Sequence, residues 1–126
     1  MSKFIVFEGI DGSGKTSQIL KTIDLLKDYN QIFVTKEPTA NKLGKHIKKL
    51  LKQDKDPKSN AEKYTQLYTL DRKYHNKQIK KQLNLNNIVI CDRYYYSTLA
   101  YQQAQGYNVK KIIEQSKKFL IPDITF

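Results

Sequence analysis

The chain has 126 residues, 39% of them hydrophobic, and carries 23 basic against 12 acidic side chains, a formal net charge of +11. This length suits one modest core, so we expect a single domain over residues 1–126. No apolar run approaches the roughly 18 residues of a membrane span, and the N-terminus enters an apolar strand without a secretory signal. We therefore expect neither a membrane partner nor export.

Two features of the composition bear on location and partners. Cys91, the only cysteine, lies in an apolar run, which predicts a small buried hydrophobe and suits the reducing cytoplasm. The basic residues are spread along the chain in short clusters, which favours solvated helix faces over a nucleic-acid surface. All of them are lysine except Arg72 and Arg93, so we expect a specific use for these two bidentate donors.

The predicted elements begin with a buried strand over 3–8, followed by a glycine loop and a helix over 15–28. The loop fits G-x-x-x-x-G-K-[ST], the phosphate-binding P-loop. Its glycines let the backbone aim several N–H groups at one point, lysine supplies a charge for the β- and γ-phosphates, and threonine can ligate Mg²⁺. We predict that triphosphate binding involves Gly9, Asp11, Gly12, Ser13, Gly14, Lys15, Thr16 and Ser17.

The rest of the chain continues the alternation of strands and helices. Further strands are predicted over 31–36 and 88–91, helices over 40–53, 61–83, 97–105 and 109–119, a polar loop over 54–60, and an extended piece over 124–126. Alternation of this kind predicts an α/β fold with a parallel sheet covered by helices on both faces.

Polar residues follow each of the first three predicted strands. The P-loop follows strand 3–8, Glu37-Pro38-Thr39 follows 31–36, and Asp92-Arg93 follows 88–91. Because the carboxyl ends of parallel strands meet at one edge of a sheet, these three segments are expected to form one site.

An ordered set of motifs resembles the thymidylate kinase family. The set comprises Phe7 to Thr16, Glu37-Pro38-Thr39, Asp92-Arg93-Tyr94, Ser97 to Gln102 and Pro122 to Phe126. The resemblance implies a P-loop NTPase-type fold, a transferase that moves the γ-phosphoryl group of ATP onto dTMP with Mg²⁺ in dTTP biosynthesis, and a homodimer.

The resemblance also implies roles around the reacting phosphates. Lys15, Asp92 and Arg93 would be catalytic, with Arg93 on the dTMP phosphate and Thr16 and Asp92 organising Mg²⁺, partly through water. Pro38 would lie near the dTMP phosphate. For Asp92 a helix cap remains the alternative interpretation. The two histidines lack metal-ligand spacing and are interpreted as ordinary helix residues.

Further positions match family contacts to the dTMP nucleoside. Asp11 would bind the 3′-hydroxyl, although a turn-forming aspartate is the alternative. Tyr68 and Arg72, four apart and so on one helix face, would stack on thymine and bond its O4; the alternative is a core tyrosine and a surface ion pair. Ser97 and Thr98 would lie at the thymine edge, and Tyr101 below the sugar.

The sequence departs from the family in three places. Thr39-Ala40 stands where the common bacterial pattern has two glycines, and Gly12 stands where some members carry a catalytic arginine. The predicted final strand is the last segment of the chain, so the resemblance covers the N-terminal two-thirds of the family pattern and implies a sheet that is incomplete before the lid and last strand.

Other function classes remain open. A non-catalytic nucleotide-binding fragment or shortened relative shares every motif. A deoxynucleoside kinase would need a carboxylate–aromatic pair after the second strand to activate a 5′-hydroxyl, and Glu37-Pro38 does not supply that pair. A GTPase would need N-K-x-D, whereas Asn41-Lys42-Leu43-Gly44 lacks the aspartate.

Overall fold

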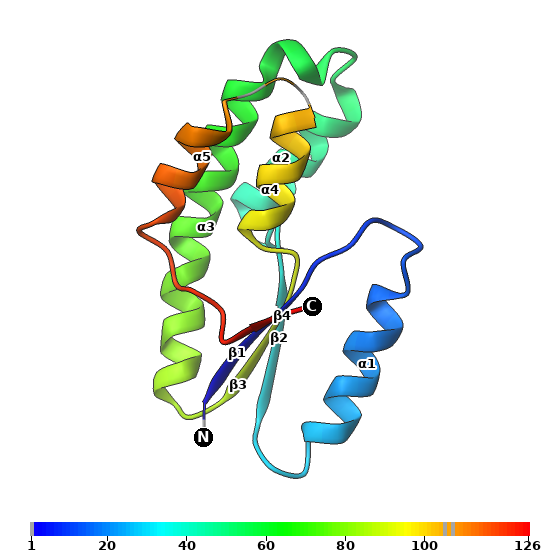
Figure 1. The fold of residues 1–126 in the computed structure, drawn as a ribbon, viewed down its shortest axis with the longest axis vertical. Helices are drawn as coiled ribbons and strands as arrows, with labels where there is room; N and C mark the ends of the chain where they lie inside the picture. Colours follow the sequence, from blue (N-terminus) through cyan, green and yellow to red (C-terminus); the bar gives the residue numbers. More distant parts are fainter. Residues whose placement is uncertain (1, 105, 107) are drawn as a thin grey trace.

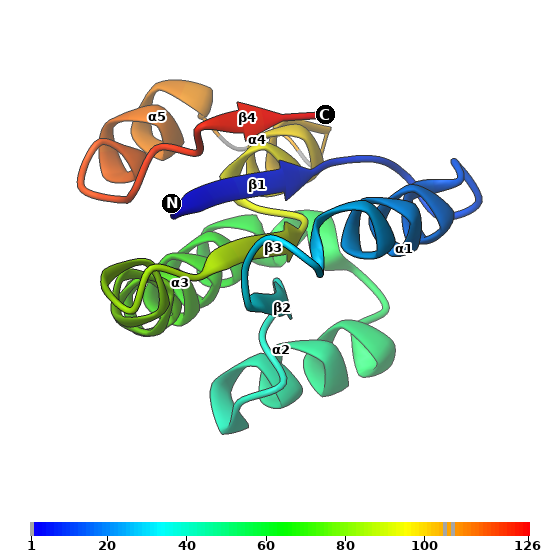
Figure 2. The same ribbon diagram turned by 90° about the horizontal axis from the view of Figure 1, so that it is seen from below.

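The computed structural model describes residues 2–104, 106 and 108–126 as a four-stranded parallel sheet with helices on both faces (Figures 1 and 2). The strand order is β2-β3-β1-β4, which confirms the predicted α/β class. Along the chain the elements are β1 (Lys3–Phe7), α1 (Lys15–Leu26), β2 (Ile32–Lys36), α2 (Lys42–Gln53), a 3₁₀ turn (Pro57–Asn60), α3 (Ala61–Asn84), β3 (Ile88–Asp92), α4 (Tyr95–Ala104), α5 (Val109–Ser116) and β4 (Ile124–Thr125).

Alternation along the central strands builds one apolar cluster on each face of the sheet. Phe4 and Val6 of β1 pack with Ile79 of α3, whereas Ile5 and Phe7 point the other way and pack with Ile19 of α1. In Figure 1 α1 accordingly lies on one side of the sheet, and α3, α4 and α5 lie on the other. The two clusters therefore hold α1 against one face of the sheet and the long helix α3 against the other.

The register of the parallel strands brings their carboxyl ends level. Phe7 of β1 lies opposite Asp92 of β3, and Asp92 lies opposite Lys36 of β2. The P-loop, the Glu37-Pro38 segment and Arg93 therefore leave the sheet side by side, as the sequence predicted.

Element boundaries differ from the predictions where side chains hold the backbone. Helix α2 begins at Lys42 rather than at residue 40, because the backbone N–H of Thr39 donates to Asp71 (2.8 Å). Helix α4 begins at Tyr95, two residues early, because the Glu8 carboxylate accepts the N–H of Tyr94 (2.6 Å) at its first turn. The predicted end of this helix, Gln105, lies outside the described residues.

Two expectations about the interior can be compared with the structure. Cys91 is fully buried and burial raises the pKa of its thiol, so it packs as a small hydrophobe, as predicted. Across the described residues, no helix has the length and apolar composition needed to cross a membrane.

Candidate functional site

The P-loop has a backbone that only glycine adopts readily at two positions. Gly12 and Gly14 have φ angles of 81° and 85°, and Gly14 directly precedes α1. The N–H of Ser13 donates a hydrogen bond to the carbonyl of Ile10 (3.2 Å), which closes the turn. The loop thus presents backbone amides and a helix N-terminus to the same space.

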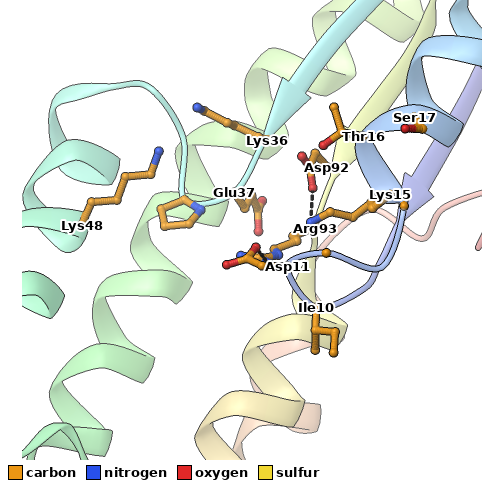
Figure 3. Close-up of a pocket in the computed structure, with 13 residues that line it drawn as sticks. Ile10, Asp11, Lys15, Thr16, Ser17, Lys36, Glu37, Lys48, Asp92 and Arg93 are labelled. Atoms are coloured by element: carbon orange, nitrogen blue, oxygen red, sulfur yellow. Dashed lines mark hydrogen bonds and ion pairs between the residues drawn. The ribbon is translucent and has the colours of Figure 1, made fainter.

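This loop forms one wall of a cavity of about 500 Å³ at the carboxyl edge of the sheet (Figure 3). Across the cavity lie Glu37 and Pro38, and its floor is formed by the Asp92-Arg93 pair. Lys15, Lys36, Lys48 and Arg93 line it together with Asp11, Glu37 and Asp92, so cationic groups outnumber carboxylates four to three. This excess of positive charge, together with the loop amides, suits a chain of phosphates.

Lys15 and Asp92 form the closest ion pair of the cavity. Nζ of Lys15 lies 2.6 Å from Oδ1 of Asp92, with 10% and 31% of the two side chains exposed. The approach lacks hydrogen-bond geometry, and Oδ1 has no other hydrogen-bond partner among the described residues. The contact is ionic, and Nζ of Lys15 occupies this buried carboxylate oxygen.

Arg93 occupies the junction between the P-loop and β3. Its φ of 69° is unusual for a side chain with a Cβ, and its N–H donates to the carbonyl of Phe7 (2.8 Å). Nη2 of Arg93 donates to Oδ1 of Asp11 (2.7 Å), whose side chain is 98% exposed. An ion pair this exposed is weak, so either member can exchange its partner for a ligand.

A second, narrower cavity of about 40 Å³ adjoins the first. We call the first space the phosphate cavity and the second the narrow cavity. Every residue of α3 or α4 that was predicted to contact the dTMP nucleoside lines the narrow cavity, together with Pro38 and Arg93. Its lining consists of Glu37, Pro38, Tyr68, Arg72, Arg93, Tyr94, Ser97, Thr98 and Tyr101. Glu37, Pro38 and Arg93 line both cavities, so the two spaces share a wall.

Arg72 is the buried centre of the narrow cavity. Only 2% of it is exposed; Nε and Nη2 lie 2.7 Å from Oε1 of Glu37, and Nη2 donates to Oγ1 of Thr98 (2.8 Å). Its guanidinium also lies 5.2 Å from the ring centre of Tyr94. Arg72 is therefore neither a surface residue nor in a surface pair, which removes the alternative interpretation of this arginine.

The other predicted nucleoside contacts take different positions. Burial raises the pKa of Tyr68, which keeps its phenol neutral at the cavity wall. Tyr101 is 44% exposed, with its ring 5.9 Å from the guanidinium of Arg93. Ser97 lines the cavity, but its hydroxyl donates to the Glu8 carboxylate at 3.1 and 3.2 Å.

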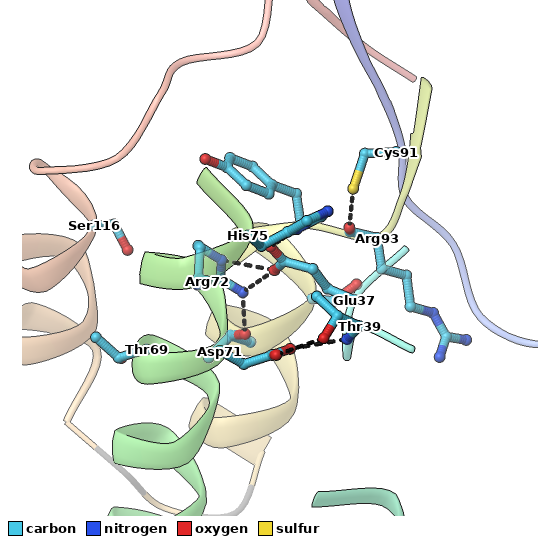
Figure 4. A network of polar contacts seen from close by, with 12 residues as sticks. Glu37, Thr39, Thr69, Asp71, Arg72, His75, Cys91, Arg93 and Ser116 are labelled. Atoms are coloured by element: carbon cyan, nitrogen blue, oxygen red, sulfur yellow. Dashed lines mark hydrogen bonds and ion pairs between the residues drawn. The ribbon is translucent and has the colours of Figure 1, made fainter. Parts of the chain in front are cut away.

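Sequence reasoning missed three residues of this region, Lys36, Lys48 and His75, and it did not predict that Glu37 is buried. Lys36 and Lys48 line the phosphate cavity, and their position at the end of a strand and on the inner side of α2 was the available signal. Glu37 is buried with both carboxylate oxygens engaged. His75, predicted as an ordinary helix residue, is fully buried and binds Glu37 through Nδ1 (2.7 Å) (Figure 4).

The donors present are compatible with Mg²⁺ bound mainly by substrate phosphates. Among the described residues no cluster of three or more His, Cys, Asp or Glu side chains could hold a metal alone. Thr16 and the partly exposed Asp92 both line the phosphate cavity, and among the described residues Oδ1 of Asp92 is held only by the ammonium of Lys15. One hydroxyl and one carboxylate match the few protein ligands that Mg²⁺ needs beside phosphate oxygens.

Fold and site together place the chain among the P-loop nucleotide-binding proteins. The family model of thymidylate kinase matches residues 7–126, so the chain belongs to the thymidylate kinase family. It is 44% identical over 124 residues to a probable thymidylate kinase of Methanococcus aeolicus, covering 98% of this chain and 59% of that protein. It is also 44% identical to the thymidylate kinase of Prochlorococcus marinus NATL2A over 141 residues, covering 98% and 64%.

A solved structure shows the same fold. The crystal structure of thymidylate kinase from Ehrlichia chaffeensis superposes with a TM-score of 0.87 at 36% identity, covering 99% of this chain and 74% of that one. The chain therefore spans about three-fifths of the length of these curated relatives, 59% and 64%.

Proposed function

We propose that the chain provides the P-loop and the acceptor site of a dTMP kinase, which transfers the γ-phosphoryl group of ATP to dTMP and yields dTDP and ADP. The observation that carries this proposal is the shared wall of the two cavities. Glu37, Pro38 and Arg93 line both the cationic phosphate cavity and the narrow cavity of Arg72. A nucleoside monophosphate whose base enters the narrow cavity, which at about 40 Å³ has to widen to admit a pyrimidine ring, would present its phosphate to the triphosphate on the P-loop.

The transfer needs alignment and charge neutralisation rather than a base, because the acceptor is already an anionic phosphate oxygen. Lys15 and the P-loop amides hold the triphosphate, and Arg93 lies between the cavities, where it can bind the acceptor phosphate. Lys36 and Lys48 add positive charge on the opposite wall. When bound, Mg²⁺ neutralises charge on the phosphates, and Thr16 and Asp92 are the residues that would hold it.

The acceptor site has chemistry suited to thymine and deoxyribose. Arg72 presents N–H donors to a keto oxygen, and the aromatic ring of Tyr68 offers a stacking surface. The Thr98 hydroxyl accepts from Arg72 and so retains its own proton for donation. Asp11 exchanges Arg93 for the 3′-hydroxyl, and Tyr101 lies on the exposed side of the cavity, where the sugar enters.

A coupled assay for ADP release with dTMP, dUMP, dGMP and thymidine tests the proposal, alongside calorimetric titration of each compound. We expect selective binding and turnover of dTMP, and loss of ATP binding in the Lys15→Ala variant because the P-loop loses its only cation. Turnover of thymidine without dTMP would contradict the proposal in favour of a deoxynucleoside kinase. Binding of dTMP with no turnover would favour a non-catalytic binding module.

One observation already speaks against thymidine as the acceptor. A kinase that phosphorylates a free 5′-hydroxyl needs an accessible carboxylate as base, and Glu37 is the carboxylate that follows β2. Glu37 is 7% exposed and both of its oxygens are bound, to Arg72 and to His75. It is therefore held as a structural anion.

We propose further that residues 1–126 act as one kinase core in the cytoplasm and that the protein forms a homodimer. The unpaired, buried Cys91 supports a reducing compartment.

Leu70 and Tyr74, one turn apart on α3, are 41% and 54% exposed, which supports a homodimer interface on this helix. Sedimentation equilibrium measures the association.

A further inference from the structure

We propose that Glu37 and His75 are positioning residues that fix the guanidinium of Arg72, and that through it they set the preference for a 4-keto over a 4-amino pyrimidine. This inference rests on the proposed function, because it concerns the same nucleoside cavity. Neither side chain needs to touch the base. Both act through the orientation of Arg72.

His75, Glu37, Arg72 and Thr98 form one continuous hydrogen-bonded chain, and Figure 4 shows its central contact between Glu37 and Arg72. Nδ1 of His75 binds Oε2 of Glu37 at 2.7 Å, and Oε1 of Glu37 accepts from Arg72 at 2.7 Å. Nη2 of Arg72 then donates to Thr98 at 2.8 Å. The chain runs from the end of β2 through α3 to α4, and every member is less than a tenth exposed.

These contacts leave Arg72 one edge for a ligand. A guanidinium carries five N–H donors in a rigid plane. Nε and Nη2 are directed at Glu37 and Thr98, and the rings of Tyr94 and Phe119 lie 5.2 and 5.9 Å from the central carbon. Nη1 has no hydrogen bond to any described residue. Its direction is therefore set by the partners of the other two nitrogens.

His75 is needed because Glu37 has two oxygens. Oε1 holds Arg72, and Oε2 would be a buried charged acceptor without a partner if the imidazole were absent. Nε2 of His75 lies 2.7 Å from Oγ1 of Thr35, which anchors the ring at its far side. Without His75, Glu37 can turn toward the adjoining phosphate cavity, and Arg72 loses its fixed acceptor.

A fixed N–H donor discriminates between pyrimidines by chemistry. It bonds the keto oxygen of thymine or uracil, but it opposes the amino group of cytosine, which is also a donor. When a site is built to make such a bond, the mismatched ligand leaves buried polar groups unpaired. A loosened Arg72 should bind dTMP less well without a matching loss for dCMP, so the ratio of the two affinities reports its orientation.

Two substitutions of His75 separate its hydrogen bonds. His75→Asn places an amide nitrogen where Nδ1 lies and keeps the contact with Glu37, whereas His75→Gln reaches the place of Nε2 and loses it. We expect His75→Gln to lower the dTMP-to-dCMP affinity ratio about tenfold, the value of one buried charge-assisted hydrogen bond. His75→Asn should keep the ratio within about twofold.

The matched control is Asp71→Asn on the same helix. Asp71 is as buried as Arg72, but it accepts from the N–H and hydroxyl of Thr39 (2.8 and 2.7 Å) and not from Arg72. Asp71→Asn should weaken the binding of dTMP and of dCMP equally. The loop that carries Thr39 moves in this variant, whereas Arg72, which donates to the base, does not. A constant ratio in this variant separates general loosening from loss of orientation.

Calorimetric titration of the 126-residue chain with dTMP and dCMP, with thermal unfolding of each variant, decides the matter. A ratio that falls in His75→Gln and is retained in His75→Asn supports the proposal. Equal losses for both nucleotides in His75→Gln overturn it, even if affinity falls. If His75→Gln does not fold, Glu37→Gln decides by the same ratio, and an unchanged ratio overturns it. A wild-type chain without preference for dTMP contradicts the proposed function itself.

Discussion

Lys36 at the end of β2 and Lys48 on α2 lie close together on the wall of the phosphate cavity that is opposite the P-loop (Figure 3). Loss of hydration, followed by the charge of Lys36, lowers the pKa of Lys48. The free protein thus holds two like charges together at a cost in stability. An anion between them would relieve that repulsion, which is the electrostatic arrangement of a phosphate site.

Replacing Lys48 with methionine should therefore change stability and binding in opposite directions. We expect Lys48→Met to stabilise the ligand-free chain by less than about 1 kcal/mol, the scale of partly exposed charge interactions. The same variant should weaken dTMP binding about tenfold because a charged donor is lost. Urea unfolding and calorimetry measure the two effects, with the exposed Lys80→Met as control. A variant that is both less stable and unchanged in binding would show that Lys48 is structural.

Glu8 provides a prediction about pH. Burial raises its pKa above the reference value of 4.5, despite the hydrogen bonds from Tyr94 and Ser97 that favour the charged form. A raised pKa means that its contribution to stability is full below pH 4.5 and is lost as pH rises through the folded-state value. We expect Glu8→Gln to be as stable as wild type below this window and more stable above it.

Urea unfolding of Glu8→Gln and wild type on both sides of the window measures this difference, and the exposed Glu114→Gln serves as control. Ionised Glu8 still accepts the N–H of Tyr94, so a small gain is consistent with the structure. If Glu8→Gln exceeded wild type in stability by more at low pH than at neutral pH, the expected direction of the pH dependence would be wrong.

At this scale the sequence predicts residues whose function depends on local spacing. The P-loop, Asp92 and Arg93 lie around one cavity as expected, and Tyr68, Arg72, Thr98 and Tyr101 line the other. His75 was not predicted as a site residue, because its partner Glu37 is 38 residues away and their meeting depends on how α3 packs. Lys36 and Lys48 resembled the many surface lysines.

At the scale of elements, α3 and α2 together hold the segment that follows β2. Asp71 and Arg72 are neighbours on α3, and they grip this segment at Thr39 and at Glu37. Helix α2 approaches its other side so closely that a Cβ on Gly44 would lie 1.9 Å from the carbonyl oxygen of Thr39. Thr39, the first residue of the Thr39-Ala40 departure from the family pattern, is thus built into a packed junction.

Gly44→Ala should consequently destabilise the chain, although alanine is the better helix former by about 1 kcal/mol. Thr39 is fixed by Asp71, so α2 must move instead, and overpacking of this kind costs roughly 1–3 kcal/mol. Lys48 would move with the helix, so dTMP affinity should fall too. Urea unfolding and calorimetry measure both, with Lys45→Ala on the exposed side of α2 as control. Greater stability in Gly44→Ala would mean that the junction is open in solution.

The sequence predicts the type and order of the elements better than their ends. Short apolar runs separated by helical segments suffice to predict the strands. A parallel strand that is buried on both faces is hydrophobic along its whole length. The start of α2 depends on the hydrogen bond between Thr39 and Asp71, 32 residues apart, and the start of α4 depends on Glu8, which lies on another strand end. Local propensity contains no information about such contacts.

At the scale of the whole molecule, α2 carries part of the positive charge of the chain to the site. The net charge is +11, and Lys42–Gln53 contains five lysines and no acidic residue. One of them, Lys48, lines the phosphate cavity, so the exposed lysines of α2 extend its positive field outward. A field of this kind raises the rate at which an anionic ligand encounters a cleft.

We therefore expect α2 to steer nucleotides into the site. The double variant Lys45→Gln with Lys49→Gln should slow dTMP association severalfold at low ionic strength and leave dissociation unchanged, because neither side chain lines either cavity. Stopped-flow measurement at two salt concentrations tests this, since screening at high salt should remove the difference. The matched control, Lys80→Gln with Lys81→Gln, removes equal charge at the end of α3 that leads into β3, at the opposite edge of the sheet. Equal slowing in both variants would show that net charge alone, and not its placement on α2, sets the association rate.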